Sequence, residues 1–181
     1  MKRISIALLS VAAMALALPA AAQMSMSSVY VGGALGQSKF KDACNGIPGC
    51  DDKDTSWGLF AGYQLNRNFS AELGYHDLGS VSVPGASIDG NAWELVAVGA
   101  WPFTNQFSVY GKLGGYRGEL KGSGVKESNT DITYGAGLQF DLNKNLGFRG
   151  EWQRYPKMGG GGFGATTDVD VLRVAALWRF Q

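Results

Sequence analysis

One histidine, one acid and one hydroxyl lie close together in the sequence, at His76, Asp77 and Ser80. These residue types are the smallest set that could support nucleophilic catalysis. Adjacent residues of a strand point to opposite faces, so His76 and Asp77 would not face each other. A catalytic site also needs its base, nucleophile and orienting group to converge. The spacing therefore favours a protein that is not an enzyme, and catalysis by these residues remains an alternative.

A second set of reactive side chains consists of five charged residues that occupy alternate positions of otherwise apolar segments: Glu72, Lys112, Arg149, Glu151 and Arg173. Charged side chains that share an interior are normally paired. The chemistry expected of this set is therefore ion pairing.

Two cysteines, Cys44 and Cys50, lie in a segment rich in turn formers and acids. In an exported protein such a close pair predicts a local disulfide. The sequence has one histidine and no second cysteine pair, which argues against zinc. The glycine-rich stretch from Met158 to Thr167 lacks the lysine and following helix of a phosphate-binding loop and is expected to be a flexible surface loop. No metal or cofactor is expected.

The N-terminus has the pattern of a secretory signal peptide. Lys2 and Arg3 precede an apolar stretch from Ile4 to Leu18, and three alanines end at position 22. Residues 1–22 are therefore predicted to direct export by the Sec pathway, and residues 23–181 to form one domain. The remaining charges are balanced and include no basic cluster with interleaved aromatic residues, so a nucleic-acid partner is not expected.

Eight segments alternate apolar with polar or small residues. Each covers roughly the 9 to 11 residues that a tilted transmembrane strand needs. The last is typical: Leu172, Val174, Ala176, Trp178 and Phe180 share one face. The segments are Val29–Gln37, Ser56–Leu65, Phe69–His76, Ala92–Trp101, Phe107–Tyr116, Ile132–Leu142, Leu146–Tyr155 and Val171–Phe180.

The connections between these segments alternate in length. Residues 66–68, 102–106 and 143–145 are short, whereas 38–55, 77–91, 117–131 and 156–168 are long and polar. Outer-membrane barrels have short turns in the periplasm, long loops outside and aromatic girdles at both interfaces. Aromatic residues near the segment ends are therefore predicted to form such girdles: Trp57, Trp93, Trp101, Trp152, Trp178 and Phe180.

A soluble eight-stranded barrel would have to bury the five charged residues in an apolar core, which is too costly without partners. The sequence thus predicts an all-β fold, an eight-stranded antiparallel transmembrane up-and-down β-barrel, with its apolar face toward lipid.

Four stretches resemble the transmembrane domain of outer-membrane protein A and its small-barrel relatives. They are GYQLNRNFSAELGYHDLG (62–79), WPFTNQFSVYGKLGG (101–115), GLQFDLNKNLGFRGEWQ (137–153) and LWRFQ (177–181). The resemblance implies a location in the bacterial outer membrane with both termini in the periplasm. The sequence ends at Gln181 without the linker and peptidoglycan-binding domain of many family members, so peptidoglycan anchoring is not carried over.

The resemblance also concerns the barrel interior, which in the family holds two glutamates, one lysine and one arginine. By register these positions fall on Glu72, Val98, Gln139 and Arg149, of which Glu72 and Arg149 keep their charge. Strands three and seven lie opposite each other, so these two residues are expected to meet and fill the narrow interior. Two alternatives stay open: a fixed polar core, or a gate in which Arg149 exchanges Glu72 for Glu151.

The expected function is that of a structural, loop-presenting membrane protein with weak passage of small ions. The alternatives are a gated narrow pore and a lipid-modifying enzyme of the outer membrane. The expected partners are outer-membrane lipid, the barrel-assembly machinery through the C-terminal strand, and an unknown molecule at the surface loops. The protein is expected to be a monomer.

Overall fold

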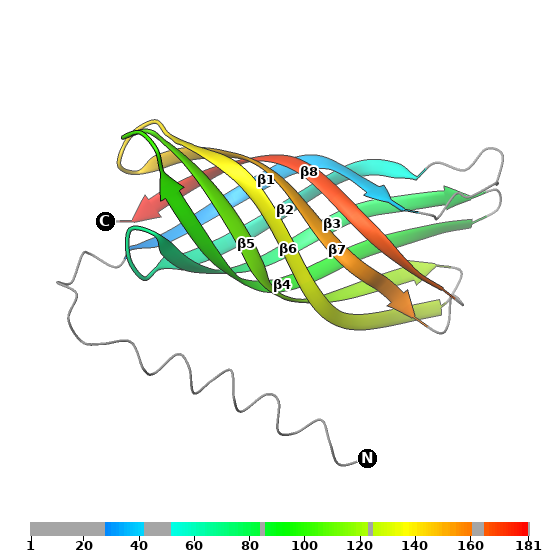
Figure 1. The fold of residues 1–181 in the computed structure, drawn as a ribbon. Helices are drawn as coiled ribbons and strands as arrows, with labels where there is room; N and C mark the ends of the chain where they lie inside the picture. Colours follow the sequence, from blue (N-terminus) through cyan, green and yellow to red (C-terminus); the bar gives the residue numbers. More distant parts are fainter. Residues whose placement is uncertain (1–27, 42–51, 84–85, 123–124, 161–164, 181) are drawn as a thin grey trace, which may run out of the picture.

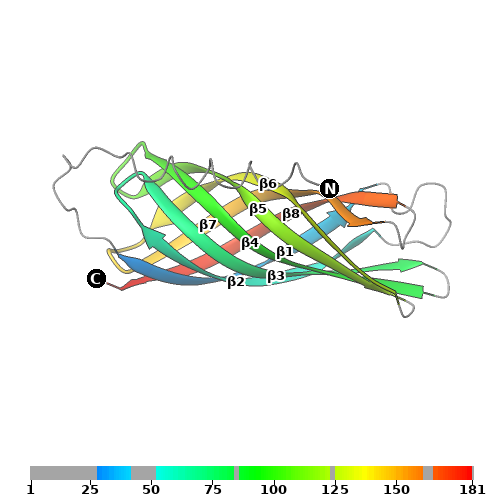
Figure 2. The ribbon, with the colours of Figure 1, turned by 90° about the horizontal axis from the view of Figure 1, so that it is seen from below.

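The computed structural model describes residues 28–41, 52–83, 86–122, 125–160 and 165–180, which form a closed barrel of eight antiparallel strands (Figures 1 and 2). Each strand pairs with its neighbours in sequence, and β1 closes the barrel against β8. The predicted fold is confirmed. The strands are β1 Val29–Phe40, β2 Lys53–Gln64, β3 Phe69–Val83, β4 Ala86–Pro102, β5 Phe107–Gly122, β6 Val125–Asp141, β7 Leu146–Gly160 and β8 Ala165–Phe180.

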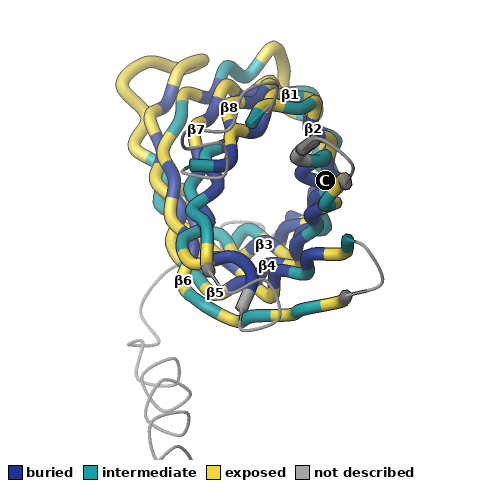
Figure 3. Tube along the Cα trace, turned by 90° about the vertical axis from the view of Figure 1, so that its right-hand side faces the viewer, coloured by how far each residue is buried: buried dark blue, intermediate teal, exposed yellow. Residues whose placement is uncertain are grey.

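Alternate side chains of each strand form the inner and the outer wall of the barrel. Figure 3 looks along the barrel and shows buried and exposed residues alternating along each strand. On β8, Leu172 and Val174 are each 68% exposed, whereas Val171 and Arg173 are buried. Apolar side chains thus cover the outside and charged ones lie inside, the reverse of a soluble core. No helix among the described residues is long and apolar enough to cross a membrane.

Three short turns, at residues 65–68, 103–106 and 142–145, lie at one end of the barrel, which we call the turn end. Each is held by one side chain that accepts hydrogen bonds from two backbone N–H groups, as Asx and ST turns do. Asn66 Oδ1 accepts from Asn68 and Phe69 at 2.8 and 2.9 Å. Thr104 and Asn143 repeat this arrangement in the other two turns.

The opposite end, which we call the hairpin end, differs from the sequence prediction. Long polar loops were expected at 77–91 and 117–131, but β3 continues to Val83 and β5 to Gly122, and β4 and β6 begin within three residues of these ends. Strand pairing also extends into 38–55 and 156–168 at both ends of each stretch. Polar side chains do not stop a backbone ladder, because its hydrogen bonds are made by the main chain whatever the side chains are. The hairpins therefore project past the apolar belt.

Two bulges interrupt the ladders near this end, between Asp77 and Gly79 on β3 and between Tyr155 and Met158 on β7. The second contains Lys157, whose φ is 53°. Extra residues in a bulge change which positions face inward. As a result Met158, expected in a surface loop, is completely buried. Leu78 is also completely buried, but it continues the regular alternation of β3 from Glu72 and His76.

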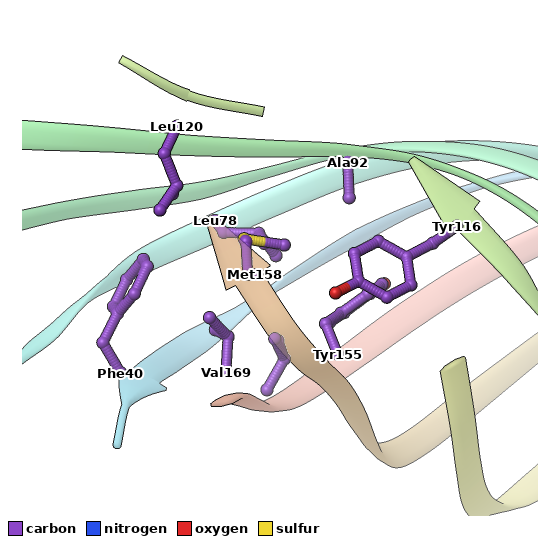
Figure 4. Packing of buried hydrophobic residues seen from close by; sticks show 9 residues of the cluster. Phe40, Leu78, Ala92, Tyr116, Leu120, Tyr155, Met158 and Val169 are labelled. Atoms are coloured by element: carbon purple, nitrogen blue, oxygen red, sulfur yellow. The ribbon is translucent and has the colours of Figure 1, made fainter. Parts of the chain in front are cut away.

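Leu78 and Met158 belong to an apolar cluster inside the hairpin end of the barrel (Figure 4). We call it the hairpin-end cluster. Its side chains come from six of the eight strands and point toward one another. The members are Phe40, Leu78, Ala92, Tyr116, Leu120, Tyr155, Met158, Val169 and Val171. The predicted signal peptide, residues 1–22, and the predicted disulfide of Cys44 and Cys50 lie outside the described residues and stay predictions.

Candidate functional site

The lumen contains a continuous network of charged side chains, and its layer nearer the turn end is centred on Lys112 of β5. Lys112 Nζ lies 2.9 Å from Glu72 Oε2 of β3 and 2.9 Å from Glu151 Oε2 of β7. Arg149 of β7 forms an ion pair with Glu72 through Nη1. All four side chains are buried, so each charge depends on these partners in place of water.

Neutral side chains complete this layer. Arg149 Nε donates to Gln139 Oε1 at 2.8 Å, and the guanidinium lies 4.9 Å from the ring centre of Tyr110. The Tyr110 hydroxyl donates to Glu151 Oε2 at 2.6 Å, and the Tyr30 hydroxyl donates to Glu72 Oε1 at 2.6 Å. Each carboxylate thus accepts from both charged and neutral donors, the arrangement that makes a buried ion tolerable.

A second layer lies nearer the hairpin end and is centred on Arg173 of β8. Arg173 Nε pairs with Glu151, and Nη1 lies 2.7 Å from His76 Nδ1. His76 Nε2 lies 3.1 Å from Glu94 Oε1 of β4. The other oxygen of Glu94 accepts from Gln153 Nε2 and from the Tyr155 hydroxyl, both at 2.7 Å. Glu151 joins the two layers.

Glycines on the inner wall make room for these side chains. A Cβ at Gly58 would lie 2.0 Å from His76 Nδ1, and one at Gly74 would lie 2.7 Å from His76 Nε2. A Cβ at Gly36 would lie 2.5 Å from the Cβ of Arg173. An eight-stranded barrel has an interior that side chains just fill, so a large inward residue requires a bare backbone opposite it.

The six residues predicted for the lumen lie in this one network: Glu72, Lys112, Gln139, Arg149, Glu151 and Arg173. Val98, at the other family position, packs instead with Val96 and Tyr110. The lumen residues predicted from the sequence did not include Glu94, His76 and Gln153. These three residues occupy inward positions of the predicted segments, which could have identified them as lumen residues. The sequence did not show which residues they contact.

The residues considered for catalysis do not converge. His76 is 1% exposed inside the lumen. Asp77 Oδ1 accepts from the backbone N–H of Gly79 at 2.9 Å. The Ser80 hydroxyl donates to Asp54 Oδ2 at 2.9 Å. Base, acid and hydroxyl therefore have separate partners. Among the described residues, no cluster of three or more histidine, cysteine or acidic side chains could hold a metal ion.

The aromatic residues predicted for the girdles lie on the outer wall. Near the hairpin end, Tyr75 lies between Trp57 and Trp93, with ring centres 6.0 and 5.0 Å apart. Near the turn end, Phe107 and Phe140 approach to 4.8 Å. All six predicted side chains are exposed or close to it: Trp57, Trp93, Trp101, Trp152, Trp178 and Phe180.

Comparison with known proteins assigns the family. Residues 8–180 match the family described as outer membrane protein beta-barrel domain. The chain belongs to this family. Outer membrane protein A of Yersinia pseudotuberculosis is 32% identical over 99% of this chain and 56% of the relative. Outer membrane protein A of Klebsiella aerogenes is 28% identical over the same shares.

The chain spans about half the length of these outer membrane protein A relatives. Among solved structures, Neisserial surface protein A covers 84% of this chain and 97% of its own, with a TM-score of 0.66 and 15% identity, which shows a shared fold. As a member of the outer membrane protein beta-barrel domain family, the protein is located in the bacterial outer membrane, and its exposed apolar belt contacts lipid.

Proposed function

We propose that this protein is a structural, hairpin-displaying barrel of the outer membrane whose lumen is closed to ions. The observation that carries the proposal is the position of Lys112 Nζ, 2.9 Å from carboxylate oxygens of both Glu72 and Glu151. Together with Arg149 and Arg173, this lysine links strands on opposite sides of the barrel. An ion entering the lumen would have to separate charges that are buried and paired, which costs several kcal/mol per charge.

Two further features support a closed lumen. A cavity of about 150 Å³ opens at the turn end and is lined by Arg149, Gln139 and Tyr110 at its inner wall. Arg179 and Asp141, paired at 2.6 Å, also line it. At the other end the hairpin-end cluster fills the interior with apolar side chains, each 5% exposed or less. An ion would thus meet a charged layer and then an apolar one.

A gated narrow pore is the second candidate. It is favoured by the equal distances of Lys112 from its two carboxylates, because Glu72 would keep a cationic partner if Arg149 left it. Arg149 would then turn to Glu151, two residues away on the same strand. Glu151 already binds Lys112, Arg173 and Tyr110, so the exchange requires one of these to leave.

Single-channel conductance in a planar bilayer separates these functions. We expect the parent to be silent and Glu72→Ala to give discrete steps, because Arg149 and Lys112 lose their shared partner. Glu119→Ala is the control, since Glu119 pairs with Lys121 and Lys126 on the projecting part of β5 and β6. Steps in the parent that grow in Glu72→Ala would instead indicate a gate.

A second variant tests whether the hairpin-end cluster also closes the lumen. Glu72→Ala combined with Met158→Ala removes charge pairing and thins the hairpin-end cluster. If Glu72→Ala is silent but the combination conducts, the cluster is the principal seal and the lumen is still closed. If the combined variant is silent as well, closure of the lumen depends on neither Glu72 nor Met158. The assignment of the seal to the charged layer and the hairpin-end cluster is then wrong.

We infer the remaining partners from the outer wall and the family. The barrel-assembly machinery is proposed to bind β8, whose outward side chains include the exposed Trp178 and Phe180. The projecting hairpins are proposed to meet an external partner, and the barrel to act as a monomer. A lipid-modifying enzyme is disfavoured by the separate partners of His76, Asp77 and Ser80.

A further inference from the structure

His76, the chain's single histidine, is enclosed in the lumen between a cation and an anion. Arg173 Nη1 approaches His76 Nδ1 at 2.7 Å, and Glu94 Oε1 approaches His76 Nε2 at 3.1 Å. The two contacts constrain the imidazole differently, because arginine carries N–H donors and no acceptor. The short contact with Arg173 therefore requires a lone pair on Nδ1, and the ring proton must be on Nε2, where it is donated to Glu94.

We propose that His76 is an acid-sensitive latch of the lumen, held as the neutral Nε2–H tautomer and released when Nδ1 takes up a proton. Protonation would turn the acceptor of Arg173 into a donor and would place two cations in contact. The favourable contact becomes a repulsive one. The inference does not depend on whether the lumen conducts.

The surroundings determine the direction of this effect. Glu94 of β4 is the anion that faces His76, and it already accepts from Gln153 and Tyr155 of β7. Arg173 of β8 is the cation in contact, Lys112 of β5 adds a second positive charge to the field, and Tyr155 lies with its ring centre 6.5 Å from the imidazole. The inner wall of β2 contributes the uncharged Gly58. Glu94 is satisfied by the Nε2 proton in both charge states, so a second proton gains no new acceptor.

The ring also has little room to move away from Arg173. A Cβ at Gly58 would lie 2.0 Å from His76 Nδ1, which shows how closely the ring packs against this backbone. Arg173 is itself buried and also holds Glu151, Gln153 and the Tyr155 hydroxyl. Its displacement would therefore loosen the whole layer around Glu94 and leave Glu151 with Lys112 and Tyr110.

Nitrogen NMR of the protein in detergent micelles or nanodiscs tests the tautomer directly. With one histidine in the chain, long-range 1H–15N correlations of the ring need no assignment. We expect the pattern of a neutral ring with the proton on Nε2 at pH 7. A proton on Nδ1, or an imidazolium at that pH, would contradict the proposal, and this readout requires no variant to fold.

Stability in detergent tests the latch itself. His76→Gln removes the titrating group and keeps a side chain that can donate and accept. Relative to this variant, the folding equilibrium constant of the parent should fall by up to about tenfold per pH unit below about pH 6.5, the pKa of a histidine in water. Carboxylates titrate in both proteins, so the difference isolates His76. An equal loss of stability in parent and variant on acidification would overturn the latch.

Discussion

Asp54 at the start of β2 shows how a single side chain fixes the barrel rim. Its Oδ2 accepts from the backbone N–H of Ser80 at 2.7 Å and from the Ser80 hydroxyl at 2.9 Å. Its Oδ1 accepts from the backbone N–H of Thr55 at 2.7 Å. The Ser80 N–H, followed by the Thr55 N–H and the Ser80 hydroxyl, lowers the pKa of this carboxyl below its ordinary value. The carboxylate form therefore joins β2 to the bulge of β3.

This shift predicts a pH dependence of stability. A carboxyl whose pKa is lower in the folded than in the unfolded protein stabilises the fold above the unfolded pKa, about 3.9, and loses that contribution as the pH falls through the folded pKa. Asp54→Asn should thus lower the free energy of unfolding at pH 7, and the difference from the parent should shrink as the pH falls below 4. Urea unfolding of both proteins at several pH values measures it. Asp89→Asn, an exposed acid of β4, is the control, and a difference independent of pH would refute the assignment.

Among single residues, the sequence indicated which side chains face inward and that Glu72 and Arg149 meet, but not the partners of Glu94 and His76. Glu94 and His76 occupy inward positions of two predicted segments. Their contact with Arg173 depends on the stagger of β8 against the other strands, which no local pattern encodes. The glycines opposite them, Gly58 and Gly74, leave space for the imidazole.

The bulge of β3 depends on a glycine. Gly79 has φ 73°, and a Cβ there would lie 2.7 Å from both Asp54 Cβ and the Thr55 carbonyl oxygen. Side chains are disfavoured at positive φ, and here the added atom would also meet backbone. Gly79→Ala should therefore lower the free energy of unfolding by more than about 1 kcal/mol.

Gly150 of β7 is the matched control for this substitution, because nothing lies within 4 Å of an added Cβ there. Urea unfolding in detergent compares Gly79→Ala and Gly150→Ala. Equal stabilities of the two variants would mean that the bulge tolerates a side chain and that Gly79 is not required for it.

The eight strands were predictable because the apolar belt requires an apolar side chain at every second position of each strand. Past the belt that signal ends, and the polar stretches 77–91 and 117–131 look like loops although the backbone pairing of β3 with β4 and of β5 with β6 continues. The hairpin-end cluster was missed for a related reason. The bulges before Gly79 and Met158 alter the alternation, so Met158 is buried by a change of phase that a regular pattern cannot show.

The apolar belt that surrounds the barrel predicts where its outer wall tolerates a charged side chain. Leu73 of β3 is 54% exposed and lies between Phe69 and Tyr75, the aromatic residues at the two ends of the belt on this strand. An arginine on the lipid face near the bilayer midplane costs about 2–4 kcal/mol, falling to about 0–1 near the interfaces. Leu73→Arg should lower the free energy of unfolding in lipid vesicles by that larger amount.

Thr55→Arg serves as the comparison, since Thr55 is exposed on β2 past Trp57 and therefore outside the belt. Denaturant unfolding in vesicles measures both variants. Similar small losses for the two substitutions would mean that Leu73 does not face the bilayer interior.

The repeated turns have a consequence for the connectivity of the chain. Asn66, Thr104 and Asn143 close three hairpins with the same pair of hydrogen bonds, and Val29 pairs with Phe180 at the same end of the barrel. The first and last strands are thus neighbours in the position of a fourth such hairpin. A fourth copy of the turn would join Phe180 to Val29, and the chain could then be opened at any of the other three. The order of the strands around the barrel does not depend on where the chain begins. Circular permutation therefore preserves every strand pairing of the barrel.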